Sequence, residues 1–113
     1  MDLSQALQMV SRSDAGMVRS HNEDAVYINA TYGLAILADG MGGYNAGEVA
    51  SGMATALLGS ELEKAFQKTE PQKLDVSGKL YSHIAMEAEI ARANTAIYQA
   101  AQSQPQYAGM GTT

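Results

Sequence analysis

The chain of 113 residues contains no cysteine, no tryptophan and a single phenylalanine, Phe66. Without cysteine it can form no disulfide, no zinc–thiolate site and no catalytic thiol. Aromatic residues make up 6% of the sequence, whereas hydrophobic residues of all kinds reach 46%. The core must therefore be built mainly from alanine, leucine, isoleucine, valine and methionine, and such a core is thin.

Basic residues are also scarce, with 7 lysines and arginines against 12 aspartates and glutamates, for a net charge of −5. This balance argues against nucleic-acid binding, which requires a clustered basic face. An acidic protein can gather divalent cations, although a solvated acidic surface explains the charge as well. No secretory signal and no apolar run of membrane-spanning length is visible. The sequence predicts one domain that is soluble and cytoplasmic.

The order of the patterns predicts an α+β protein with a strand hairpin followed by two long helices. Residues 7–12 are expected to form a first strand. The β-rich run Ala25–Asn29 and the apolar run Leu34–Ala38 are separated by a short turn, which predicts an antiparallel hairpin. Because Leu34–Ala38 is apolar without alternation, both faces of this strand are expected to be covered.

Two amphipathic segments predict antiparallel helices packed on the sheet. The first begins near Asn45, with Glu48 three residues later as in a capping box. The second runs from about Lys79 to Gln102. Apolar spacing predicts a buried stripe on each helix. The stripes comprise Val49, Met53, Ala56, Leu57 and Phe66 on the first helix, and Ile84, Ala88, Ala91, Thr95 and Tyr98 on the second.

The most informative motif is Asp39-Gly40-Met41-Gly42-Gly43, between the apolar strand and the first helix. A carboxylate at a strand end, followed by glycines with bare backbone, is a good place to hold a cation or a phosphate. The motif is neither a Walker A loop nor a dinucleotide-binding fingerprint. A tight strand-to-helix turn, with Asp39 as a capping residue, would explain it equally well.

The segment Arg19–Asp24 supplies a cation and two further carboxylates, Glu23 and Asp24. A hairpin would return the chain so that Asp24 and Asp39 lie near the same end of the sheet. Two such carboxylates repel each other, and either a bound divalent ion or a shared proton removes the repulsion. A surface strand edge with ordinary salt bridges is the alternative interpretation.

Three motifs therefore follow one another along the chain: Arg19-x-x-Asn22-Glu23-Asp24, Leu37-Ala38-Asp39-Gly40-Met41-Gly42-Gly43 and Glu48-Val49-Ala50-Ser51. Together they resemble the metal-dependent serine/threonine protein phosphatases of type 2C. Ser13-Asp14-x-Gly16 is similar to the bacterial branch, and Gly109-Met110-Gly111-Thr112-Thr113 is similar to a segment that opens a later strand there. The resemblance implies that residues 1–113 are the N-terminal portion of a catalytic domain, namely part of a β-sandwich flanked by antiparallel helices.

The resemblance also implies roles for individual residues. Asp39 would bridge two Mn²⁺ or Mg²⁺ ions, the carbonyl of Gly40 would ligate one of them, and Asp24, with Glu23 as a further candidate, would hold that ion directly or through water. Arg19 would bind the phosphate of a phosphoserine or phosphothreonine. A metal-activated water would be the nucleophile, with no phosphoenzyme. The expected partners are phosphorylated proteins that are substrates of a serine/threonine kinase.

The family's remaining metal-binding aspartates follow the Gly-Thr-Thr segment, where this sequence ends at Thr113. The 113 residues alone are therefore expected to be inactive, and to be unstable or to self-associate. A non-catalytic relative that binds a metal or a partner is the alternative function, and a structural domain with an incidental acidic loop is a third. His21, beside the site, is a weaker candidate for contact with substrate, whereas His83 is expected to be a polar residue on the surface of the second helix.

Overall fold

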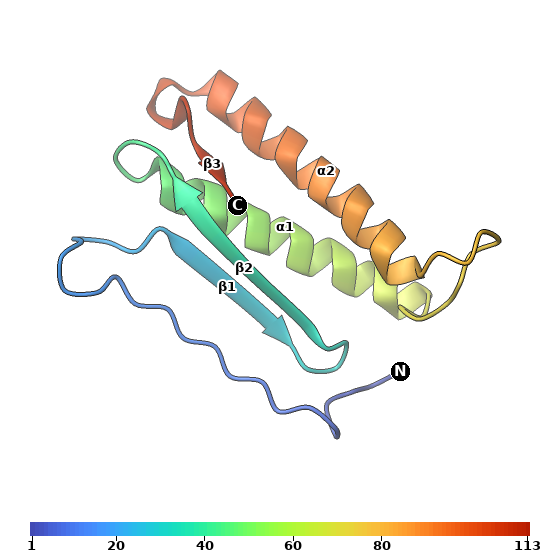
Figure 1. Ribbon diagram of the computed structural model, residues 1–113. Coiled ribbons are helices and arrows are strands. Elements are labelled where there is room, and N and C mark those ends of the chain that lie inside the picture. Colours follow the sequence, from blue (N-terminus) through green and yellow to red (C-terminus); the bar gives the residue numbers. More distant parts are fainter.

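The computed structural model describes all residues, 1–113, as one three-stranded sheet with two long helices (Figure 1). The α+β class, the hairpin and the two helices are confirmed. In chain order the elements are β1 (Asp24–Asn29), β2 (Leu34–Met41), α1 (Ala46–Lys68), α2 (Tyr81–Ser103), a short 3₁₀ helix (Pro105–Tyr107) and β3 (Gly111–Thr112). The strand order is β1-β2-β3, with both pairs antiparallel.

The hairpin is formed by β1 and β2, whose register runs from Asp24 opposite Asp39 to Asn29 opposite Leu34. Val26 and Ile28 favour the extended backbone of β1 because their branched side chains suit a pleated surface. Gly33, at a φ of 63°, closes the turn in a conformation that favours glycine. The predicted strand at residues 7–12 is wrong: the chain before β1 is irregular and largely exposed.

Strand β2 is covered on one face only, so the prediction that both of its faces are covered is wrong. Leu34, Ala38 and Gly40 are buried against the helices, whereas Leu37 and Met41 alternate with them and are exposed. Helices α1 and α2 both lie on one side of the sheet, which leaves the other side open (Figure 1). The strand therefore alternates in burial although its sequence does not alternate in polarity.

Helices α1 and α2 lie side by side, and most of the residues that they bury are small. The predicted stripes are largely wrong, because Phe66 is the only one of their members that is fully buried. The buried positions are Ala46, Gly47, Ala50, Ser51, Ala54, Thr55, Gly59, Leu62 and Phe66 in α1, and Ala85, Glu89, Ala93, Ile97 and Ala101 in α2. Small side chains let α1 approach the sheet closely and let α2 approach α1 closely. Asn45 does occupy the N-cap position of α1, but its side chain makes no capping hydrogen bond.

Many larger apolar side chains stay exposed as a consequence. Leu37, Ile90 and Tyr98 retain 69%, 55% and 63% of their accessible surface. They line an open apolar groove of about 640 Å³ that extends along β2, β3 and α2. Neither α1 nor α2 combines the length and the apolar character that a membrane span requires.

Candidate functional site

Asp24 and Asp39 face each other across the first residue pair of the hairpin. The preceding pair is hydrogen-bonded, since the N–H of Gly40 donates to the carbonyl of Glu23 at 3.1 Å. The two aspartates therefore form a non-hydrogen-bonded pair, in which Cβ atoms lie about 4.5–5.5 Å apart. Asp39 alternates with the buried Ala38 and Gly40, so the pair lies on the open face of the sheet. The fold thus brings together two of the predicted metal ligands.

The electrostatics of this pair favour a proton or a cation between the carboxylates. Desolvation raises the pKa of Asp24, and the negative charge of Asp39 raises it further. The charge of Arg19 acts in the opposite direction and lowers the pKa of Asp24. Both carboxylates can remain ionised at low cost only if positive charge is added close to them.

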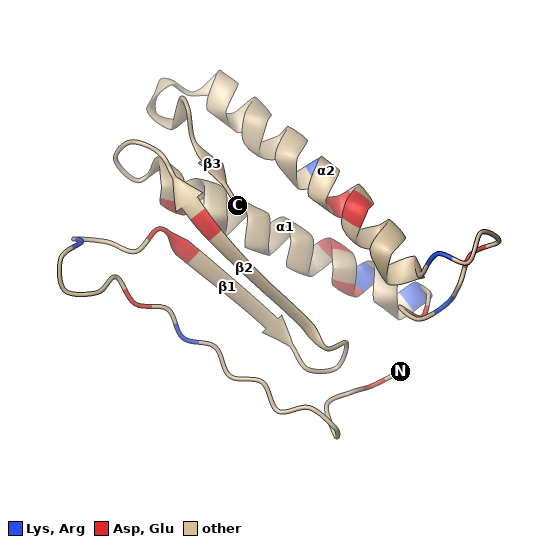
Figure 2. Ribbon diagram, in the orientation of Figure 1, with Lys and Arg blue, Asp and Glu red and all other residues tan.

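Arg19 lies in the irregular segment just before β1. Acidic residues, drawn red in Figure 2, lie at the start of β1 and near the arrowhead of β2. The Arg19 side chain is exposed and forms no ion pair within 4 Å. It is close enough to Asp24 for its charge to affect that carboxyl group. A guanidinium in this position is free to bind a phosphate through two parallel hydrogen bonds.

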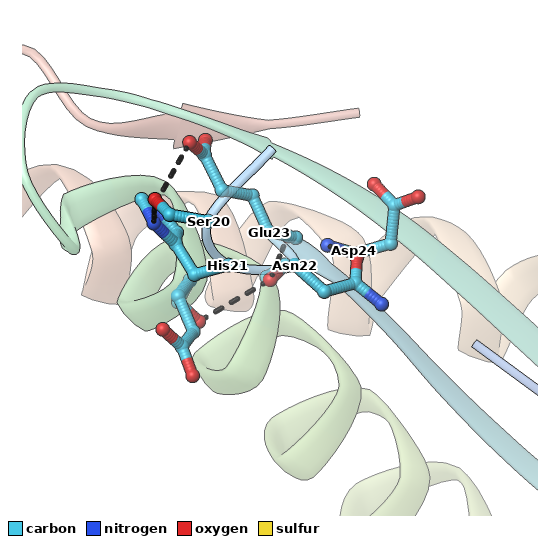
Figure 3. Close-up of polar contacts among 7 residues, drawn as sticks. Ser20, His21, Asn22, Glu23 and Asp24 are labelled. Carbon is cyan, nitrogen blue, oxygen red and sulfur yellow. Dashed lines mark hydrogen bonds and ion pairs between the residues drawn. The ribbon is translucent and has the colours of Figure 1, made fainter. Parts of the chain in front are cut away.

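Glu23 is directed away from the aspartate pair, although it precedes Asp24 in the sequence. Figure 3 shows the Glu23 and Asp24 side chains pointing in different directions. The Glu23 carboxylate lies 3.4 Å from Nε2 of His21 and against Gly47, at the start of α1. Neighbouring residues in an extended chain face opposite sides, and a prediction that groups Glu23 with Asp24 overlooks this alternation.

The glycines of the loop allow β2 and α1 to cross in direct backbone contact. A Cβ atom at Gly40 would overlap with the carbonyl oxygen of Gly47 and would lie 2.7 Å from the carbonyl oxygen of Glu23. A Cβ atom at Gly47 would overlap with the Glu23 carboxylate. Gly43, by contrast, has open space around it. Gly40 and Gly47 are therefore required for packing, whereas Gly43 is not.

The carbonyl of Gly40, the third predicted ligand, lies beside the aspartate pair. The N–H of Glu23 does not donate to it, which leaves this carbonyl without its usual ladder partner. On the opposite edge of β2, Asp39 is held by β3: its N–H donates to the carbonyl of Thr113 at 2.7 Å, and its own carbonyl accepts the Thr112 hydroxyl at 2.9 Å. Carboxylate and carbonyl oxygens suit Mg²⁺ and Mn²⁺.

This donor set is small, because no group of three or more histidine, aspartate or glutamate side chains converges on one point. The two histidines differ in position. His21 adjoins the site and contacts Ser20 and Glu23, whereas His83 is exposed on α2. Sequence reasoning included Ser51 in a motif but missed its role: this buried residue of α1 donates its hydroxyl to the carbonyl of Glu23 at 2.6 Å.

Comparison with known proteins finds bacterial phosphatases whose sequences are similar to this chain. The chain is 40% identical over 107 residues to the serine/threonine protein phosphatase PstP of Mycobacterium tuberculosis. It is 35% identical over 105 residues to the serine/threonine phosphatase stp of Listeria welshimeri, and 38% identical over 104 residues to the protein phosphatase PhpP of Streptococcus pneumoniae. The matches cover 95%, 90% and 89% of this chain. Over almost its whole length, the chain is therefore similar to a segment of bacterial serine/threonine protein phosphatases.

A solved relative has the same fold in this region. The crystal structure of the Mycobacterium tuberculosis serine/threonine phosphatase PstP/Ppp matches with a TM-score of 0.69 and 37% sequence identity, over 90% of this chain. No family model matches the sequence. The chain spans 18% of the length of PstP, 38% of stp and of PhpP, and 37% of the crystallised chain. The resemblance to serine/threonine phosphatases is thus confirmed, for a segment shorter than those relatives.

Proposed function

We propose that this chain forms one wall of a metal-dependent phosphatase site that hydrolyses phosphoserine and phosphothreonine in proteins. The observation that carries the proposal is the direct pairing of Asp24 with Asp39 on the open face, with Arg19 nearby. Two carboxylates and the Gly40 carbonyl would hold Mn²⁺ or Mg²⁺, and Arg19 would bind the substrate phosphate. Divalent ions bound there would supply Lewis acidity and an activated water. The roles of these residues come from their chemistry and from the family resemblance.

Within this site the chain's own residues have separable tasks. The strand pairing fixes the Asp39 backbone, so its carboxylate is presented without a large loss of conformational freedom on binding. Asp24 completes a chelating pair and is more readily protonated than a free aspartate. Arg19 would orient the phosphate and neutralise its charge. Glu23 faces the helix side of the sheet, so we assign it a supporting position, with any contact to metal made through water.

Titration with Mn²⁺ tests the metal site, by calorimetry on the wild-type chain and on Asp39→Asn. We expect the variant to bind at least about tenfold more weakly, because it loses one of two carboxylates. Glu61→Gln is the matched control, since Glu61 is an exposed acid on α1 that pairs with Lys64. It removes the same charge and should bind Mn²⁺ like the wild type. Equal affinity in Asp39→Asn and wild type would exclude Asp39 as a ligand.

Activity is best tested on the protein encoded by the whole reading frame, with a phosphothreonine peptide as substrate. We expect turnover that needs added Mn²⁺ or Mg²⁺ and that falls sharply in Arg19→Ala. Arg19→Lys keeps the charge but not the planar fork, so it should recover only part of the loss. Undiminished turnover after thorough chelation would rule out the metal mechanism.

A non-catalytic module that binds a metal or a partner is a second candidate for the 113-residue chain. It is favoured by the convergence of only two acidic side chains at the site. In that case the chain should bind Mn²⁺ and show no phosphopeptide turnover at any metal concentration. Turnover by the isolated chain would eliminate this candidate.

A further inference from the structure

The backbone carbonyl of Glu23 is a junction of three elements. It accepts the N–H of Gly40 in β2 at 3.1 Å and the hydroxyl of Ser51 in α1 at 2.6 Å, and it immediately precedes β1. Ser51 retains only 1% of its accessible surface. A second acceptor for its hydroxyl, the carbonyl of Glu48, lies further away at 3.2 Å. The single hydroxyl hydrogen of Ser51 therefore points toward the backbone carbonyl oxygen of Glu23.

The Glu23 junction decides where Asp24 lies. The bond from Gly40 to Glu23 defines the residue pair next to Asp24 and Asp39, so it fixes the register at the open end of the hairpin. A shift of one residue would move Asp24 to the helix-covered face and separate it from Asp39. The hairpin turn lies at the other end of β1, and strand ends fray readily. The Ser51 hydroxyl in α1 is a second donor to the Glu23 carbonyl, and it stabilises the strand pairing at this end of the hairpin.

We propose that Ser51 is a positioning residue for the Asp24–Asp39 pair. Its hydroxyl holds the Glu23 carbonyl in place for Gly40 and so keeps the two carboxylates on one face, at the spacing that a divalent ion requires. The proposal rests on the metal site of the proposed function. Ser51 itself lies on the helix side of the sheet and touches neither the metal nor the substrate.

A buried hydroxyl one turn further along α1 shows how unusual this contact is. Thr55 is also buried, but its hydroxyl donates within its own helix, to the carbonyls of Ser51 at 3.1 Å and Gly52 at 3.2 Å. Such local bonds are common for serine and threonine in helices. Ser51 instead reaches a residue 28 positions earlier in the sequence. Thr55→Val is therefore a matched control that removes a buried hydroxyl without touching Glu23.

The test compares Ser51→Ala with Thr55→Val by two measurements: Mn²⁺ affinity from calorimetry, and hydrogen exchange of the Gly40 amide from NMR. We expect Ser51→Ala to weaken Mn²⁺ binding about tenfold, within the range typical of residues that support metal ligands, and to speed Gly40 exchange by a similar factor. Thr55→Val should leave both near wild type. Ser51→Cys keeps a weak donor and should fall between wild type and Ser51→Ala, which also covers the case in which Ser51→Ala does not fold.

Two outcomes would overturn the proposal: Gly40 exchange that is unchanged in Ser51→Ala, or an equal effect of Thr55→Val on both measurements. The proposed function can fail separately. If the wild-type chain binds no Mn²⁺, the metal site is wrong, and Gly40 exchange alone still decides whether Ser51 positions the strand pair.

Discussion

Gly47→Ala tests whether the crossing of β2 and α1 is as tight as the structure shows. A Cβ atom at Gly47 would overlap with the Glu23 carboxylate and would lie 2.9 Å from the backbone nitrogen of Met41. Gly52 lies five residues further along the same helix, and a Cβ atom there would meet nothing within 4 Å. The two substitutions are chemically identical, and the added methyl group has far less room at Gly47 than at Gly52.

The expected magnitudes follow from two opposing effects. Glycine to alanine inside a helix stabilises by about 0.5–1 kcal/mol, because the unfolded chain loses freedom. Overpacking typically costs about 1–3 kcal/mol. Gly52→Ala should therefore stabilise the fold, whereas Gly47→Ala should destabilise it. The difference between the two variants isolates the steric cost, and each kcal/mol corresponds to about 4–8 °C in Tm for a domain of this size.

Urea unfolding followed by circular dichroism at 222 nm measures both variants, at one fixed protein concentration because association shifts apparent stability. Replacing Glu23 by alanine in the Gly47→Ala background should recover part of the loss, since the carboxylate is one of the two obstacles. The contact with the Met41 nitrogen remains, so recovery should be incomplete. Equal stability of Gly47→Ala and Gly52→Ala would refute the close crossing.

Three further predictions concern the charged pair and the apolar groove. Without metal at neutral pH, Asp39→Asn should raise Tm, because it removes the repulsion that raises the pKa of Asp24; an unchanged or lower Tm would count against a strained pair. Because the pKa of Asp24 is raised in the folded state, the folded chain binds the Asp24 proton more tightly than the unfolded chain does. The stabilisation that this proton provides is therefore complete below the ordinary aspartate pKa of about 3.9, and it is lost as pH rises through the raised pKa of Asp24. The Tm of the wild type relative to that of Asp24→Asn should therefore fall as the pH is raised from 3 to 7. Light scattering should show self-association of the wild-type chain that decreases in Leu37→Lys and Ile90→Lys, since both side chains line the exposed groove; a monodisperse wild-type monomer would contradict this.

The hairpin and the order of the motifs could be predicted from the sequence because they depend on short-range features. Branched residues, a glycine turn and two strand-like runs specify β1 and β2 with little help from the rest of the chain. That hairpin brings Asp24 to Asp39, so the centre of the candidate site was also accessible from sequence. The opposite directions of Glu23 and Asp24 could have been inferred from strand alternation alone.

The buried faces of the helices could not be predicted in the same way. Apolar spacing favoured stripes that include Ile84 and Tyr98, but most of the positions that the structure buries on the helices are alanine, serine or glycine. Large apolar residues normally mark a buried face, and here close backbone approach selects small ones instead. Likewise, the uniform polarity of β2 could not show that only one of its faces is covered, because coverage depends on where the helices lie.

The sequence by itself therefore determined the resemblance to serine/threonine phosphatases, the hairpin and the aspartate pair, because each of these depends on residues close together in the chain or on a fixed order of motifs. Only the tertiary structure showed that Ser51 supports the carbonyl of Glu23 and that Gly47 makes room for the Glu23 carboxylate. Both contacts join residues more than twenty positions apart. They exist only because α1 packs against the end of the sheet, and no local pattern specifies that contact.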